Sequence, residues 1–107
     1  MAVTTPKALF RGAATTTTST VLYTVPASTT TIVTNIAVVN ASLTTAFTFT
    51  MGMGTAGANT ALHAGTPIAA STTAYIDLKL PLIATNTITG GASSTAVSFH
   101  IAGVEIV

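Results

Sequence analysis

The stretch Thr20–Asn40, TVLYTVPASTTTIVTNIAVVN, contains twenty-one residues and no charged side chain. Its Thr, Val and Ile side chains are β-branched, which favours the pleated backbone of a strand. Pro26 and the small residues after it end one strand and form a turn, and the longest predicted strand runs from Thr30 to Asn40. The stretch therefore predicts two strands in a protein whose polar surface consists of hydroxyl groups.

Both faces of the long strand are largely apolar. Strict alternation predicts two opposite sets of side chains: Ile32, Thr34, Ile36 and Val38, and Val33, Asn35, Ala37 and Val39. An antiparallel strand with one face in water normally alternates with polar residues. We therefore expect one face to pack on the core and the other to be covered by a loop, the N-terminal segment or another subunit. The alternative is that Thr, Asn and Ala make the second face polar enough for water.

Further strand-length segments follow, separated by turn residues. In the segment 74–80 the apolar side chains alternate with Tyr75, Asp77 and Lys79, which we predict to face outward. No segment shows the 3.6-residue apolar period and the capping residues of a helix. The sequence therefore predicts an all-β fold, a two-sheet antiparallel β-sandwich with connections like those of a jelly roll.

The alternation of apolar and polar residues is interrupted in the last predicted strand. Its apolar residues up to Ile101 share one face, whereas strict alternation sends Val104 and Ile106 to the opposite face. A β-bulge at Gly103 would return these two side chains to the core and leave Glu105 in water. We therefore predict a bulge at this glycine.

The first eighteen residues differ from the rest of the chain. Residues 1–18 hold two cations, a charge of +2, while residues 19–107 hold one cation and two carboxylates, a charge of −1, which gives the total of +1. We predict an extended N-terminal arm, 1–18, followed by one sandwich domain, 19–107. The arm is expected to attach to a partner or neighbouring subunit through Lys7, Leu9, Phe10 and Arg11. The alternative is a frayed, solvated terminus.

The composition excludes several classes of function. Only 5% of the residues are charged and the net charge is +1, so the cations that a nucleic-acid-binding protein needs are missing. The chain has no cysteine, which excludes disulfides and thiol chemistry. No run of apolar residues approaches the length that spans a membrane, and the opening residues lack the apolar region of a signal peptide. We therefore expect no nucleic-acid partner, no membrane association and no secretion by the usual route.

A glycine motif, Gly52-Met53-Gly54-Thr55-Ala56-Gly57, has the spacing of a dinucleotide-binding fingerprint, and Asp77 follows it by twenty residues. That fingerprint requires a helix directly after the glycines, whose N-terminus holds the pyrophosphate. The residues that follow include Gly65 and Pro67 and cannot form such a helix. We therefore predict a glycine-rich loop over 52–59 and no nucleotide cofactor.

Catalytic and metal-binding residues are scarce. His63 and His100 are the only imidazoles, and Asp77 and Glu105 are the only carboxylates. A zinc site needs three or four ligands, and no G-x-S-x-G motif is present for a serine nucleophile. We predict no enzymatic activity and no cofactor, with His100 exposed or at an interface. Copies of one histidine meeting on a symmetry axis remain an alternative route to a metal site.

Three stretches together carry a resemblance: VLYTVPASTTTIVTNIAVVNAS (21–42), GTPIAASTTAYIDLKLPLIATNTITGG (65–91) and TAVSFHIAGVEI (95–106). They resemble the small virion structural proteins of tailed bacteriophages. The sequence departs from that pattern at Ser28, where a turn glycine is common, and at Thr85-Asn86, where Gly-Asp is common. Both departures concern loop geometry, and the resemblance implies no catalytic residues.

The resemblance implies a capsid decoration (cement) protein that binds the outer surface of the head and stabilises the shell. The implied partners are the major capsid protein or another virion protein, in a homo-oligomer for which a trimer is favoured, and the implied location is the virion, assembled in the host cytoplasm. The alternative is a tail, fibre or baseplate component that binds another virion protein or a host glycan. An enzyme or carbohydrate-binding module would need aromatic or carboxylate groups in which this sequence is poor.

The candidate interface combines the arm, the second face of the long strand and the exposed histidine. Its residues are Lys7, Leu9, Phe10, Arg11, Val33, Asn35, Ala37, Val39 and His100.

Overall fold

The computed structural model describes residues 3–55 and 58–107, and this part of the chain is built from strands and their connections. The strands are β1 Thr4–Ala13, β2 Val21–Thr24, β3 Thr30–Asn40, β4 Phe47–Thr55, β5 Ala58–Ile68, β6 Thr72–Leu82, β7 Asn86–Ala92 and β8 Val97–Ile106. Within the described ranges no helix is long and apolar enough to cross a membrane.

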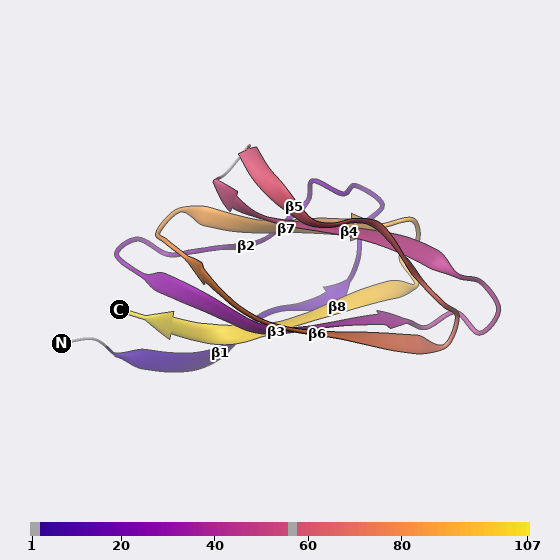
Figure 1. Cartoon of the computed structure of the whole chain (residues 1–107), viewed down its shortest axis with the longest axis horizontal. Coiled ribbons are helices and arrows are strands. Elements are labelled where there is room, and N and C mark those ends of the chain that lie inside the picture. Colours follow the sequence, from indigo (N-terminus) through magenta and orange to yellow (C-terminus); the bar gives the residue numbers. More distant parts are fainter. Residues whose placement is uncertain (1–2, 56–57) are drawn as a thin grey trace.

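Two four-stranded sheets, in the orders β1-β8-β3-β6 and β2-β7-β4-β5, form the two layers seen in Figure 1. All of the paired strands are antiparallel. Apart from β4 to β5, every connection passes from one sheet to the other. The predicted all-β antiparallel sandwich is confirmed, and its connections are like those of a jelly roll.

The core lies between the two sheets and receives apolar side chains from both. Phe99 of β8 meets Phe49 of β4 across the layers, with ring centroids 6.2 Å apart in an edge-to-face arrangement. Met51 and Ile88 from one sheet and Ile36 from the other are completely buried in the same cluster. The inward direction predicted for the apolar residues of 74–80 is confirmed, because they pack against this cluster while Tyr75, Asp77 and Lys79 are exposed.

Strand β3 departs from strict alternation at Thr34. The register with both of its neighbours shifts between Val33 and Asn35. Relative to β8, Thr34 is an extra, exposed residue, whereas on the other side two residues of β6, Leu78 and Lys79, lie opposite Thr34. Val33, predicted on the second face, is therefore in the core with 0% of its surface exposed. The side chains of Ile32, Asn35, Ala37 and Val39 therefore share the outward side of β3.

The bulge predicted at Gly103 of β8 is found in the neighbouring strands instead. Strand β8 keeps its alternation. Strand β1 carries an extra residue at Leu9, beside the Ile101-Ala102 step, and β3 carries an extra residue at Thr34, beside the Ala102-Gly103 step. The prediction that Glu105 lies in water is therefore wrong. Its side chain points into the space between the sheets, and Val104 and Ile106 lie on the outside.

Gly103 allows the bulged strand to approach β8 closely. A Cβ atom at this position would lie 2.3 Å from the carbonyl oxygen of Ile32 and 3.0 Å from Cδ1 of Leu9. Any larger residue would have to push β3 away from β8. The glycine therefore acts through close packing of the backbone, and the irregularity that it permits lies in its neighbour.

The segment expected as an arm is extended, but its residues Thr4–Ala13 are paired along β8 as an edge strand. Leu9 is buried in the core and Phe10 packs against it. Because these two apolar side chains anchor β1 to the core, this part of the segment belongs to the sandwich in the structure.

The connection from β1 to β2 crosses to the other sheet (Figure 1) and is hydrogen-bonded to the end of β7. The amides of Ala92 and Gly90 donate to the carbonyl oxygens of Thr15 (2.8 Å) and Thr20 (3.0 Å). A Cβ at Gly91 would lie 2.5 Å from the carbonyl oxygen of Thr17. Glycine at the end of β7 therefore makes room for a threonine-rich connection that is fixed by hydrogen bonds.

We predict that Gly103→Ala destabilises the fold by roughly 1–3 kcal/mol, because the new methyl group overlaps the backbone of β3. Gly12→Ala is the matched control, since a Cβ there meets nothing closer than Cζ of Phe10 at 3.5 Å. Urea unfolding followed by circular dichroism measures both variants. Equal stability of the two would contradict the close approach of β3 and β8.

Candidate functional site

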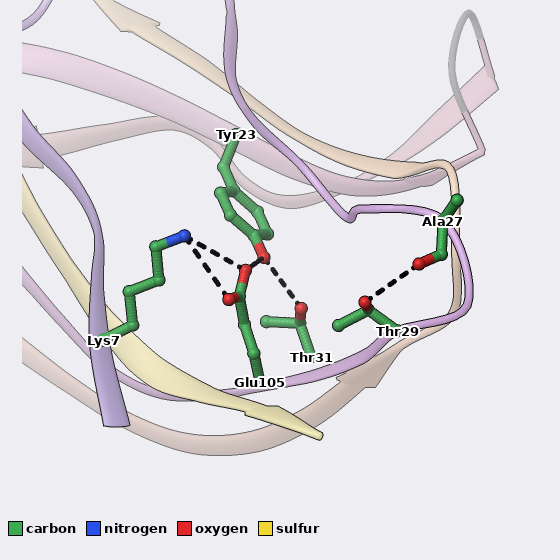
Figure 2. A network of polar contacts seen from close by, with 6 residues as sticks. All are labelled: Lys7, Tyr23, Ala27, Thr29, Thr31 and Glu105. Carbon is green, nitrogen blue, oxygen red and sulfur yellow. Dashed lines mark hydrogen bonds and ion pairs between the residues drawn. The ribbon is translucent and has the colours of Figure 1, made fainter. Parts of the chain in front are cut away.

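A polar network joins the two sheets at one end of the sandwich (Figure 2). The hydroxyl of Tyr23, on β2, donates to Oε2 of Glu105, on β8 of the opposite sheet. The same hydroxyl lies 2.9 Å from Oγ1 of Thr31, on β3, and Nζ of Lys7, on β1, lies 3.4 Å from both carboxylate oxygens. Four strands thus contribute one side chain each to a single cluster.

The electrostatics of this cluster favour the hydrogen bond between Tyr23 and Glu105 at neutral pH. Burial, followed by the hydrogen bond to Glu105, raises the pKa of Tyr23 to about 12. The hydrogen bond from Tyr23, followed by the bond and charge of Lys7, lowers the pKa of Glu105. At neutral pH the phenol therefore keeps its proton and the carboxylate stays ionised, a state in which their hydrogen bond joins the two sheets.

The outward side of the sheet β1-β8-β3-β6, here called the outer face, is the second candidate. Its central row runs across all four strands and contains Arg11, His100, Ala37 and Tyr75. The next row contains Ala8, Ala102, Asn35 and Asp77. Nδ2 of Asn35 donates to Oδ1 of Asp77 at 2.9 Å, which fixes the end of that row.

The outer face brings together five of the nine predicted interface residues: Arg11, Asn35, Ala37, Val39 and His100. The other four lie elsewhere. Leu9 and Val33 are in the core, Phe10 packs against it, and Lys7 forms an ion pair with Glu105. These four residues are not part of the outer face.

Sequence reasoning missed Tyr75 as an interface candidate and missed the bond between Tyr23 and Glu105. Tyr75 is 74% exposed and lies in the same row as Arg11 and His100. The outward direction of Tyr75 was visible in the sequence, but its row depends on the pairing of strands far apart in the chain. For Glu105, continued alternation after Phe99 would have indicated an inward side chain.

A hollow of about 340 Å³ lies on the outward side of the other sheet, beneath the connection from β1 to β2. Hydroxyl and small apolar side chains line it, among them Thr18, Val21, Thr50 and Ala61. No charged or aromatic residue belongs to its lining. It therefore lacks the groups that bind a charged substrate or stack on a sugar ring.

The glycine motif lies in an antiparallel hairpin. Gly52 and Gly54 belong to β4, and strand β5 follows where a nucleotide-binding fold would need a helix. The predicted loop over 52–59 is thus mostly strand, while Ala56 and Gly57 lie outside the described residues. The pairing of β4 with β5 leaves no helix N-terminus at this motif for a pyrophosphate.

The two histidines lie in different sheets. His63, on β5, packs against Phe49 with ring centroids 5.4 Å apart, and His100, on β8, is exposed on the outer face. Among the residues of 3–55 and 58–107, no group of three or more histidine, aspartate or glutamate side chains is arranged to hold a metal ion.

The fold is similar to that of viral coat proteins. The coat protein of tobacco streak virus matches 98% of this chain over 83% of its own length, with a TM-score of 0.52 and 15% identity. The VP2 subviral particle of infectious bursal disease virus gives a TM-score of 0.55 at 7% identity, over 98% of this chain and 32% of that chain.

A pentameric capsid protein from metagenomic phage sequences gives a TM-score of 0.44 at 13% identity, with 97% of this chain covering 60% of that protein. This chain thus spans less than two thirds of the phage protein and of VP2. No protein-family model and no curated protein sequence matches the chain. At these identities the likeness establishes a shared fold.

We predict that the network makes stability depend on pH at both extremes. Because the pKa of folded Glu105 is lowered from 4.5, its contribution is present above that value and is lost as the pH falls through the lower folded pKa. Because the pKa of Tyr23 is raised from 10.0 to about 12, its contribution is present below pH 10 and is lost as the pH rises towards 12. Urea unfolding at a series of pH values measures both limbs.

Tyr23→Phe removes the hydrogen bond to Glu105, on which both the acidic and the alkaline part of the pH dependence of stability rely. We expect a loss of roughly 1–3 kcal/mol at neutral pH and a flatter pH profile. Tyr75→Phe is the matched control, since Tyr75 is 74% exposed and lies outside the network. An alkaline limb that persists unchanged in Tyr23→Phe would show that another group causes it.

Proposed function

We propose that this chain is a structural protein of a virus particle and acts by binding other proteins. The observation that carries the proposal is the outer face, a four-stranded surface that is poor in charge: its two central rows hold Arg11 and Asp77, and Lys79 lies beside Asp77 on β6. The similarity of the whole chain to a viral coat protein supports the same function, because 98% of the chain matches it at a TM-score of 0.52.

The physical reason is the cost of removing charge from water. An ionised side chain that is buried at an interface without a partner loses much of its hydration energy. Thr, Ser, Val and Ala side chains can be covered at little cost, and threonine hydroxyls still form hydrogen bonds across a contact. A protein with 5% charged residues is therefore suited to a location where neighbouring subunits cover most of its surface.

The finer proposal is a capsid decoration protein that binds the outer surface of a phage head and stabilises the shell, with the major capsid protein as its partner. The resemblance of residues 20–107 to small virion proteins of tailed phages supports this role. A tail, fibre or baseplate component remains the alternative from the same resemblance. In either case the chain would act in the virion, without catalysis and without a cofactor.

A subunit that builds the shell itself is the second candidate. One observation favours it: this chain covers 83% of the tobacco streak virus coat protein, so the sandwich alone accounts for most of that protein. A shell subunit and a decoration protein differ in what remains when the chain is missing. Without a decoration protein a shell still assembles, and without a shell subunit it does not.

The oligomeric state follows from the surfaces that are used. A closed trimer needs two different surfaces that fit each other, whereas a twofold pair needs one surface that fits itself. The trimer favoured from the sequence thus requires a second contact surface in addition to the outer face. We propose a homo-oligomer in which the outer face supplies one contact.

We predict hundreds of copies of this chain per purified particle, measured by quantitative mass spectrometry against the major shell protein. Particles made with Val39→Lys should contain several-fold fewer copies, because a cation on the outer face must be desolvated in the contact. Thr48→Lys, exposed on the other sheet, is the control. A handful of copies would support the tail alternative, and absence from the particle would refute a virion role.

A further inference from the structure

The outer face carries a pattern that fits a second copy of itself. We infer that two chains associate outer face to outer face about a twofold axis. This axis runs parallel to the strands and lies midway between the two outer faces in contact. The inference rests on the proposed function in one respect, because it assumes that this surface is covered by protein. It goes further by naming the partner, the geometry and the residues in contact.

The order of strands determines which side chains would meet. Rotation about an axis parallel to the strands places β1 of one copy over β6 of the other, and β8 of one copy over β3 of the other. The rotation does not change the position of a residue along the strand direction. Each row of one copy therefore faces the same row of the other copy, with the order of the strands reversed.

The central row is complementary to its own reverse. Arg11 of one copy would face Tyr75 of the other, where the guanidinium can lie over an aromatic ring that is 74% exposed. His100 of one copy would face Ala37 of the other, so a large side chain meets a small one. The twofold axis repeats both contacts, which gives four per pair from this row.

The neighbouring row shows the same property. Its half on β1 and β8 consists of Ala8 and Ala102, and its half on β3 and β6 consists of Asn35 and Asp77. Reversal places the two small side chains opposite the two larger ones. In these two rows the sheets can thus approach without a collision of bulky groups, at the roughly 10 Å spacing of packed sheets.

Charge is complementary in the same orientation. Arg11 lies on the β1 edge and Asp77 on the β6 edge, one step apart along the strand in adjacent rows. The β6 edge also carries the exposed Lys79, two residues beyond Asp77 and outside these two rows. Among the described residues the single ion pair is Lys7 with Glu105, so neither Arg11 nor Asp77 has a charged partner within the chain. An axis parallel to the strands brings the guanidinium of each copy near the carboxylate of the other.

The alternative twofold axis, perpendicular to the strands, fits less well. It would place β1 over β1 and β6 over β6, so that Arg11 shares an edge with its own copy and Asp77 with its own copy. Like charges at one edge of an interface are unfavourable. The charge of Arg11 at the β1 edge thus favours the axis parallel to the strands, whereas the β6 edge, with both Asp77 and Lys79, does not distinguish the two arrangements.

The outer face is large enough for a stable pair. Its four strands have ten, ten, eleven and eleven residues, which at standard strand spacing gives roughly 600 Å² per copy. Two copies would bury roughly 1,200 Å², the lower end of the range for specific protein interfaces. The pair is therefore expected to be reversible and dependent on concentration.

Exchange of the two charges tests the arrangement. Arg11→Glu places two carboxylates together in a pair of identical chains, and Asp77→Arg places two guanidiniums together. We expect each variant alone to dissociate with a constant about tenfold or more above that of the wild type in sedimentation velocity. In an equimolar mixture both contacts again join opposite charges, so association should return to within about threefold of the wild type.

The matched control uses Thr48→Glu and Thr48→Arg, which introduce the same charges on the outward side of the other sheet. These variants should associate like the wild type, alone and mixed. Circular dichroism of every variant checks that the sandwich is folded, which we expect because Arg11 and Asp77 are exposed.

The inference is supported only if association is weakened in each single variant and recovers in their mixture. Three results overturn it: a wild type that is monomeric at all concentrations, single variants that associate normally, or a mixture that fails to recover. A monomeric wild type whose incorporation into particles is still reduced by Val39→Lys would assign the outer face to a different virion protein. Absence from particles refutes the proposed function but leaves the association measurement intact, so the two failures are distinguishable.

Discussion

The central constraint in this structure is the register of β8 against its two neighbours around Ala102. Each neighbour carries one extra residue there: Leu9 of β1 lies beside the Ile101-Ala102 step, and Thr34 of β3 lies beside the Ala102-Gly103 step. Gly103 permits this arrangement because a Cβ there would collide with the backbone of β3. Beyond the bulges the side chains of β1 and β3 change face, and β8 between them keeps its alternation.

This one feature determines the arrangement of side chains both inside the sandwich and on its outer face. On the inside, uninterrupted alternation of β8 carries Glu105 toward the opposite sheet, where Tyr23 binds it. On the outside, the bulge in β3 aligns Asn35 and Ala37 with Ala102 and His100. The network that joins the sheets and the row pattern of the outer face therefore both depend on the same close approach of β3 and β8.

Much of the fold could be predicted from local pattern alone. The alternation of 74–80 identified the inward side of β6 correctly. The two-sided apolar character of Thr30–Asn40 predicts a cover on both faces of the strand; the core covers one of them, and the cover of the outward face stays a prediction. The bulge was assigned to the wrong strand. A local pattern shows that one residue too many is present, but the strand that carries it is decided by pairing over long distances in the sequence.

A prediction of the candidate site from the sequence depends even more on the pairing of strands that are far apart in the chain. Glu105 and Tyr23 are separated by 82 positions, and neither has a local neighbour that indicates the bond. The rows of the outer face combine β1, β8, β3 and β6, the first and last strands among them. Scarcity of charge was readable from the composition, but its distribution over two opposite edges became visible only with the strand order. In a surface this poor in charge, a single well-placed ion can influence orientation, and Arg11 on the β1 edge has no ion-pair partner among the described residues.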